Sequence, residues 1–279
     1  MNKTLRIVLL TLATGGVLAA AGGAAAIYLG VYDISATRQH TGPVYQLLDV
    51  ALRRAVAVRA ADIDAPALDD AGRVQRGLAL YQQHCVQCHG APGVAPQPFA
   101  LGLNPAPAAL AKTPRTWPAP EMFWVIRHGI KMTGMPAWQY RLSDEQIWDV
   151  VAFMRTLPEL SPADYRRLSR DAAPVAVTDR PARRPPDLRA GRDAMHQYLC
   201  ATCHAIPGVV GAQHEVGPSL AGMAKRPLIA GSLPNTPETM AAWLRDPGRH
   251  APGTAMPDLD VSEQDARDMA AFLATLDKE

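Results

Sequence analysis

The pattern of apolar and polar positions divides the chain into an apolar start, two similar helical halves and a connector. Every residue from Ile7 to Tyr32 is uncharged, which gives a run of 26 residues. As a helix this run would be roughly 39 Å long, enough to cross a hydrocarbon core of about 30 Å. We therefore predict a transmembrane anchor over residues 1–36. The alternative is a cleaved signal peptide, whose apolar stretch is usually about 7 to 15 residues.

The segment from 37 to 66 predicts a juxtamembrane helix followed by a spacer. A helix of about 16 residues is expected to begin near Pro43, with leucine and valine side chains on one side and three arginines on the other. Such a helix just outside a membrane can rest on lipid headgroups or pack on a partner subunit. Packing on its own domain is an equally good interpretation.

The rest of the chain consists of two similar halves. Residues 70–93 and 187–208 share a glycine eight or nine positions before a cysteine, and a ring side chain four positions before it. Residues 142–157 and 261–276 are also alike, with Ser143 and Ser262 expected as N-caps before acidic residues. Because each half opens and closes with a helix, we predict two all-α domains, residues 67–160 and 187–279.

The connector between the halves, residues 161–186, is rich in proline, alanine and arginine and has no hydrophobic periodicity. It predicts an extended, partly polyproline linker.

Composition narrows the functional classes. The formal net charge is only +2, so acidic and basic side chains are close to balanced. This argues against a nucleic-acid binder, because neutralising phosphates requires a strongly basic face. Aromatic residues make up 6% of the chain, which favours short helices joined by loops over a sheet.

All four cysteines lie in two copies of Cys-x-x-Cys-His, "CVQCH" at 85–89 and "CATCH" at 200–204. This motif is typical of covalent c-type haem attachment, in which both thiols bind one porphyrin and the adjacent histidine ligates its iron. The alternatives are a disulfide framework, a zinc site and a thioredoxin-like redox pair. Recurrence in matching surroundings favours two covalently bound haem c groups, held by Cys85, Cys88 and His89 and by Cys200, Cys203 and His204.

A second axial ligand is expected about 50 residues downstream of each motif. Met135 and Met256 each precede a proline and each lie just before the closing helix of their half. A lone methionine is more often a core residue, but two Met-Pro pairs at equivalent positions favour ligation. Met132 and Met122 are weaker candidates in the first half. The predicted iron ligands are therefore His89, Met135, His204 and Met256.

With these motifs the two halves resemble class I cytochromes c, in which an N-terminal helix crosses a C-terminal one over the haem. "VGPSLAGMAKR", "GSLPNTPETMAAWLRDP" and "PGTAMPDL" resemble cytochrome c domains that serve or are fused to haem-copper oxidases. This resemblance implies that the Pro218 carbonyl accepts the His204 N–H. It places Arg226 and Asn235 near a propionate, and Trp243 near the methionine ligand. The first half lacks this pattern, so Pro107 is only suggested as the residue whose carbonyl accepts the N–H of the proximal histidine.

The anchor and the first half resemble membrane-anchored cytochromes of proteobacterial respiratory chains. That resemblance implies a single-electron carrier without a catalytic residue, passing electrons from a quinol-oxidising complex to a terminal oxidase. Lys3 and Arg6 precede the apolar run, so the haem domains are expected on the periplasmic side of the inner membrane.

Two other functions stay open. One is an enzyme, a diheme peroxidase or a thiosulfate-oxidising cytochrome, although the latter needs a fifth cysteine. The other is a cytochrome subunit of an oxidase or periplasmic dehydrogenase complex.

Overall fold

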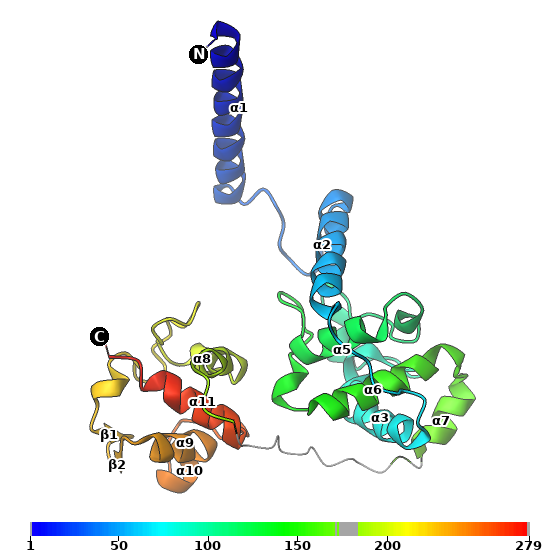
Figure 1. The fold of residues 1–279 in the computed structure, drawn as a ribbon, viewed down its shortest axis with the longest axis vertical. Coiled ribbons are helices and arrows are strands. Elements are labelled where there is room, and N and C mark those ends of the chain that lie inside the picture. Colours follow the sequence, from blue (N-terminus) through cyan, green and yellow to red (C-terminus); the bar gives the residue numbers. More distant parts are fainter. Residues whose placement is uncertain (1, 171, 173–183, 278–279) are drawn as a thin grey trace.

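The computed structural model describes residues 2–170, 172 and 184–277 of the chain. Two helical domains, each with its own core, lie beside each other, and two N-terminal helices stand on one side of them (Figure 1). We refer to α3 to α7 as the first domain and to α8 to α11 as the second domain. The predicted all-α architecture is confirmed.

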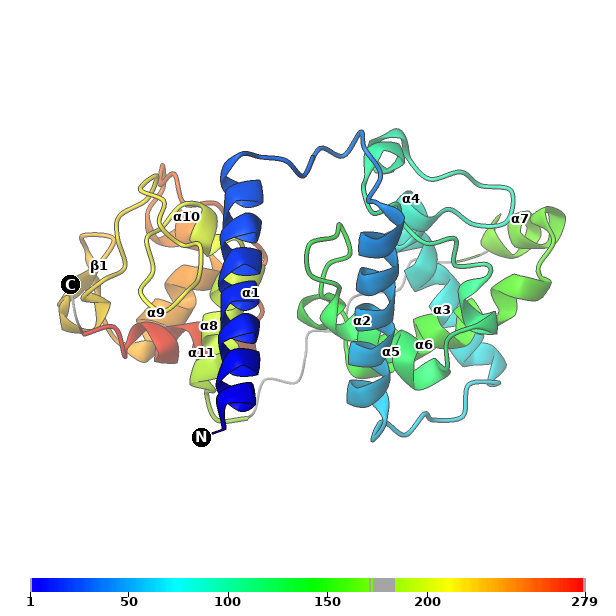
Figure 2. The ribbon, with the colours of Figure 1, turned by 90° about the horizontal axis from the view of Figure 1, so that it is seen from above.

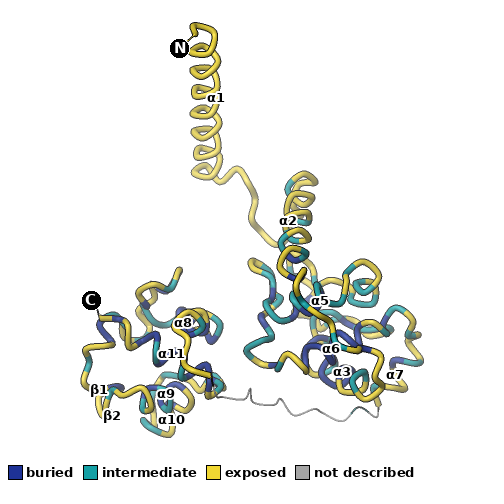
Figure 3. Tube along the Cα trace, viewed as in Figure 1, coloured by how far each residue is buried: buried dark blue, intermediate teal, exposed yellow. Residues whose placement is uncertain are grey.

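Helix α1, Lys3–Tyr28, is the one described helix that is long and apolar enough to cross a membrane. It has no buried residue, as the yellow tube in Figure 3 shows, and its N-terminus is capped by Asn2. A helix that exposes leucine and valine side chains along its full length matches the apolar interior of a bilayer better than water.

Helix α2, Gly42–Ala60, begins at the predicted position, with Pro43 in its first turn. One side packs on the first domain: Val56 and Ala60 are buried, α2 contacts α5, and the Arg53 guanidinium lies 5.2 Å from the centre of the Trp117 ring. Packing on its own domain is therefore part of the role of this helix. Leu47 and Val50 on another side are exposed.

The first domain contains α3 (Ala71–His84), α4 (Val86–His89), α5 (Ala119–His128), α6 (Asp144–Thr156) and α7 (Pro162–Arg170). Short 3-10 helices lie between them: η1 (Pro98–Gly102), η2 (Thr113–Arg115), η3 (Trp138–Tyr140) and η4 (Leu157–Glu159). The predicted N-cap of α6 is confirmed, since Ser143 and Gln146 form a capping box.

The helix crossing of the first domain depends on a glycine. Gly77 of α3 lies against the backbone of Asp149 in α6, where a Cβ atom at Gly77 would approach the Asp149 carbonyl carbon to 2.6 Å. The Asp149 side chain then binds back to α3, accepting hydrogen bonds from Arg76 Nε at 2.8 Å and Nη2 at 3.1 Å. The crossing thus joins a close backbone contact to an ion pair whose carboxylate is buried and whose guanidinium is half exposed.

The second domain contains α8 (Leu188–Gln197), α9 (Pro237–Arg245), α10 (Pro247–His250) and α11 (Glu263–Leu273). It also has η5 (Cys200–Thr202), η6 (Met223–Lys225) and a short antiparallel pair, β1 (Leu228–Ile229) and β2 (Leu233–Pro234). The predicted N-cap of α11 is confirmed, since the Ser262 side chain accepts the Asp265 N–H at 3.1 Å.

The same crossing recurs in the second domain. A Cβ atom at Gly191 of α8 would lie 2.5 Å from the Asp268 carbonyl carbon and 3.0 Å from the Met269 nitrogen of α11. The Asp268 carboxylate is fully buried and binds the Arg184 guanidinium, the Asp187 N–H and the Gln264 amide. The glycines noted before each cysteine motif therefore sit at the two helix crossings.

The predicted extended linker is wrong over its first third. Residues 162–170 form α7, and Tyr165 in this helix packs on the core of the first domain with 3% of its surface exposed. Ser161 starts the helix, because its hydroxyl accepts the Asp164 N–H at 3.1 Å. Residues 171 and 173–183, in the remainder of the predicted linker, lie outside the described residues.

Candidate haem sites

In the first domain the cysteine motif continues directly from α3. Cys85 ends this helix, and α4 carries Cys88 and His89 one turn further on. Cys85 is buried in apolar surroundings, and this burial raises the pKa of its thiol to about 12. The Tyr81 hydroxyl donates to the Gly90 carbonyl at 2.7 Å and so fixes the turn that follows His89. Both thiols and the imidazole thus belong to one short, rigid segment.

The His89 imidazole is oriented by a backbone carbonyl. Its Nδ1–H donates to the Ala108 carbonyl at 2.8 Å. The sequence suggested that Pro107 supplies this carbonyl. That suggestion is wrong by one residue, because the loop turns the Ala108 carbonyl toward the ring. Burial lowers the pKa of His89, which favours the neutral imidazole that ligates metals. With Nδ1 engaged, Nε2 is the nitrogen left for iron.

In the second domain a strained residue turns the chain into the motif. Leu199, between α8 and η5, has φ 61° in the left-handed region, which non-glycine residues seldom adopt. Cys200 starts η5, and burial raises the pKa of its thiol to about 11. The His204 Nδ1–H donates to the Pro218 carbonyl at 2.7 Å. This hydrogen bond is the one implied by the resemblance, and it matches that of His89.

Gly217 makes room for the His204 ring. A Cβ atom at this position would lie 2.7 Å from Nδ1 and 2.9 Å from Nε2 of the imidazole. Real Cβ atoms do not approach a ring nitrogen so closely, so only glycine allows this stacking of backbone on the imidazole. The pair Gly217-Pro218 therefore supplies both the space for the ring and the carbonyl that orients it.

Replacing Gly217 with alanine should push the His204 ring away and break its hydrogen bond to Pro218. We expect the second domain to lose about 1 to 3 kcal/mol of unfolding free energy, the usual cost of overpacking. Denaturant unfolding followed by circular dichroism measures this loss. Gly248→Ala is the matched control, because the nearest atom to its added Cβ lies 3.8 Å away. Equal stabilities of the two variants would contradict the packing argument.

Met135 and Met256 occupy equivalent turns in the two domains. The Met135 N–H donates to the Thr133 hydroxyl at 3.0 Å, and the Met256 N–H donates to the Thr254 hydroxyl at 3.2 Å. Both side chains are half-buried against their domain core. The threonine two residues before each methionine escaped the sequence prediction, although the shared pattern Thr-x-Met-Pro is visible in both halves.

The weaker methionine candidates have other surroundings. Met132 is 97% exposed, and Met122 is buried within α5 in the core of the first domain. Neither shares the Thr-x-Met-Pro turn, and ligation by Met135 stays a prediction.

Arg226 and Asn235 hold the loops of the second domain together. Arg226 Nη2 donates to the Ser219 and Ala221 carbonyls at 2.6 and 3.0 Å. Asn235 Nδ2 donates to the carbonyls of Met223 and Arg226, both at 2.8 Å. Trp243 is 8% exposed and belongs to the core of this domain. Their expected positions near a propionate and near Met256 stay predictions.

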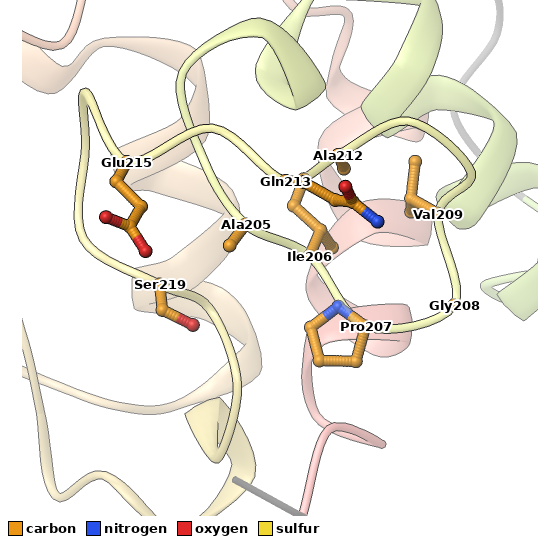
Figure 4. Close-up of a pocket in the computed structure, with 9 residues that line it drawn as sticks. All are labelled: Ala205, Ile206, Pro207, Gly208, Val209, Ala212, Gln213, Glu215 and Ser219. Carbon is orange, nitrogen blue, oxygen red and sulfur yellow. The ribbon is translucent and has the colours of Figure 1, made fainter.

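A pocket of about 470 Å³ lies in the loop that follows His204 (Figure 4). Pro207, Val209 and Gln213 line one part of it, and Glu215 and Ser219 the other. None of the cysteine, histidine or methionine candidates lines this pocket. It is therefore a hollow of the loop rather than the place where the candidate ligands converge.

The alternative chemistries for the cysteines find little support. All four cysteines are free thiols. Within the described parts of the chain, no three His, Cys, Asp or Glu side chains form a group suited to a metal ion. A zinc site that recruits both cysteine pairs is thus not assembled. The residues fit haem c instead, since each domain pairs two thiols with one carbonyl-oriented imidazole.

Two family models match the chain, one in each domain. The family described as "Cytochrome C oxidase, cbb3-type, subunit III" matches residues 72–154, and the family "Cytochrome c" matches residues 188–277. The chain is also 37% identical over 87 residues to "Cytochrome c oxidase subunit 2" of Alkalihalophilus pseudofirmus. This similarity covers 31% of the chain and only 25% of that relative. No solved structure matches the chain.

Each matched range covers most of one helical domain and includes its cysteine motif, and the first match ends before α7. The residues that carry the resemblance seen in the sequence therefore lie where the family models match. Cytochrome c domains bind haem c covalently and transfer electrons. The chain is thus built from two c-type cytochrome domains in tandem, which follow an apolar N-terminal helix.

Proposed function

We propose that the chain is a membrane-anchored diheme electron carrier that passes single electrons toward a terminal oxidase. The observation that carries this proposal is the recurrence of one arrangement in both domains. Each has two thiols, an imidazole held by a carbonyl at 2.7 or 2.8 Å, and a methionine in a Thr-x-Met-Pro turn. Haem c, when bound, supplies a one-electron iron couple.

The ligand set of each domain suits electron transfer rather than catalysis. Cys85, Cys88, His89 and Met135 would hold the first haem, and Cys200, Cys203, His204 and Met256 the second. With both a histidine and a methionine bound, the iron would have no open position for a substrate, and thioether ligation would favour a high reduction potential. No residue of either domain is assigned to proton transfer or to a covalent step.

Helix α1 supports attachment to a membrane. It is apolar and exposed along its length, and basic residues precede its apolar part. Basic residues beside a membrane helix usually stay on the inner side of the membrane. Since Lys3 and Arg6 precede the apolar part of α1, we propose that the two domains lie on the periplasmic face of the inner membrane.

The identity of the partner rests on the named relatives. One family model is that of an oxidase subunit, and the similar Alkalihalophilus pseudofirmus protein is itself called an oxidase subunit. We place a terminal oxidase as electron acceptor, and a quinol-oxidising complex or periplasmic dehydrogenase as electron donor.

The same names favour a second candidate, a cytochrome subunit bound permanently within an oxidase complex. Detergent extraction followed by native sizing separates the two. A free carrier migrates as a single chain of 29.9 kDa in its detergent micelle, whereas a subunit remains in a much larger assembly with oxidase activity.

The haem count tests the central claim. The purified chain should contain two covalent haems, and the double variant Cys200→Ser, Cys203→Ser should contain one. We expect haem attachment at one motif to be independent of the other, because each motif lies in a domain with its own core. The pyridine haemochrome assay measures the ratio, and the matched variant Cys85→Ser, Cys88→Ser should also retain one haem. Pigment that acid-acetone extracts from the denatured wild-type chain would contradict the claim.

A further inference from the structure

The two domains touch at residues that are not among the candidate haem ligands. Tyr198, two residues before Cys200, packs edge-on against Tyr140 of η3, with ring centres 6.0 Å apart. The Arg141 guanidinium lies 4.6 Å from the centre of the Tyr198 ring. The Tyr198 hydroxyl is also 3.4 Å from the Tyr140 carbonyl. One tyrosine of the second domain is therefore held by two consecutive residues of the first.

Tyr198 is fixed on its own side as well. Its hydroxyl donates to the Asp265 carboxylate at 2.8 Å, and only 1% of its surface is exposed. Asp265 also accepts a hydrogen bond from the Ser262 hydroxyl at 2.8 Å, at the start of α11. The ring is thus clamped between the first turn of α11 and the first domain. In Figures 1 and 2, α8 and α11 lie on the side of the second domain that is nearer the first.

The two halves differ in the residue that stands two positions before the first cysteine of the motif. Counted from the first cysteine of each motif, Tyr198 corresponds to Gln83, which is exposed. At this position the two halves therefore differ: the second domain has a buried ring that meets the first domain, and the first domain has an exposed amide.

The contact lies between the two cysteine motifs. In the first domain, the His84 ring next to Cys85 packs on Trp138 of η3, with ring centres 5.1 Å apart. Two residues further along the chain is Tyr140, which meets Tyr198, and two residues after that is Cys200. Two ring pairs, His84 with Trp138 and Tyr140 with Tyr198, therefore meet at the short helix η3, one beside each motif.

We infer that Tyr140, Arg141 and Tyr198 form a docking interface that holds the two haem-attachment motifs at a fixed separation within one chain. Because the domains are tethered, a contact too weak to join separate molecules suffices to dock them. A cation over a desolvated tyrosine ring is among the stronger contacts available to such a small interface. This inference rests on the proposed function. The interface would set the distance over which an electron passes from one site, which is oxidised, to the other, which is reduced, and no bond is made or broken.

Photo-crosslinking tests the contact in the full-length holoprotein. Replacing Tyr140 with p-benzoylphenylalanine keeps an aromatic ring in place, and irradiation should link it to the segment 194–203 of the same chain. The product should migrate as a monomer, and mass spectrometry should identify the joined peptides. The same probe at Arg166, an exposed residue of α7, is the control and should give no such link. Links between different chains, or none to the second domain, would overturn the inference.

Arg141→Ala then tests the energetics without touching the second domain. Loss of the cation over the Tyr198 ring should lower the intramolecular crosslink yield by about tenfold. Electron redistribution between the sites after partial reduction should slow in parallel. Arg166→Ala should change neither quantity. An Arg141→Ala protein that crosslinks and equilibrates like the wild type refutes the interface.

Failure of this inference and failure of the proposed function are distinguishable. Two haems per chain with no crosslink would leave the electron carrier standing and remove the interface. A haem count other than two with a strong crosslink would leave the interface standing and remove the diheme function.

Discussion

Replacing Gly191 with valine should prevent the second domain from folding. The valine side chain would have to enter the space held by the Asp268 carbonyl carbon and the Met269 nitrogen, 2.5 and 3.0 Å from the position of its Cβ. These are backbone atoms in the middle of α11, so no side-chain movement can relieve the overlap. Overpacking usually costs about 1 to 3 kcal/mol and more where the backbone cannot shift. Here the cost approaches the roughly 5 to 15 kcal/mol that stabilise a whole domain.

The measurement must resolve the two domains. Limited proteolysis of the variant should degrade the segment after residue 187, whereas the first domain persists and keeps its haem. Gly77→Val should instead unfold the first domain and leave the second domain folded, because an added Cβ at Gly77 would overlap Asp149 and Phe153 in the same way. Gly248→Ala in the second domain serves as the tolerated control. A folded, protease-resistant Gly191→Val protein would show that the helix crossing is not what the close contact indicates.

Replacing Met256 with alanine should lower the reduction potential of the second site and remove the thioether absorption band of its ferric form. Axial ligand identity moves haem potentials over roughly 0.8 V, and loss of a thioether should shift the second site downward by on the order of 0.1 V. Potentiometric titration with optical detection measures both quantities. The turn itself should survive, because the Met256 N–H, which binds the Thr254 hydroxyl, is part of the backbone.

Met135→Ala should do the same at the first site and leave the second unchanged. Met132→Ala is the matched control, since this side chain is 97% exposed and lies three residues away in the same loop. If Met132→Ala removed the thioether band and Met135→Ala did not, the assignment of the ligand in the first domain would be wrong.

The local signals of the sequence were reliable wherever a short stretch of chain carries the whole physical reason. The N-caps Ser143 and Ser262 form because a hydroxyl and the N–H groups it binds are neighbours in sequence. The cysteine motif is likewise complete within five residues. The same kind of signal was overlooked at Ser161-Pro162, where a capping serine before a proline starts α7 inside the predicted linker.

Features that depend on contact between two distant segments could not be predicted from short stretches of the sequence. The carbonyl that holds His89 belongs to Ala108 rather than Pro107, since the path of a 19-residue loop decides which carbonyl faces the ring. The contact between Tyr198 and Tyr140 joins residues that are 58 positions apart, and no local sequence pattern near either residue predicts it. The glycine before each motif was visible as a repeat, but its reason, the contact with Asp149 or Asp268, exists only once the helices cross.

The sequence alone determined the candidate chemistry of this protein: two Cys-x-x-Cys-His motifs, two Met-Pro pairs and an apolar segment at the start. Each of these follows from residue type and from spacing along a few turns of chain. Only the tertiary structure decided which backbone groups orient the imidazoles, where the helices touch and how one domain meets the other. Those choices depend on packing between distant segments, because van der Waals contact and hydrogen bonding act over a few ångströms in space, whatever the separation along the chain.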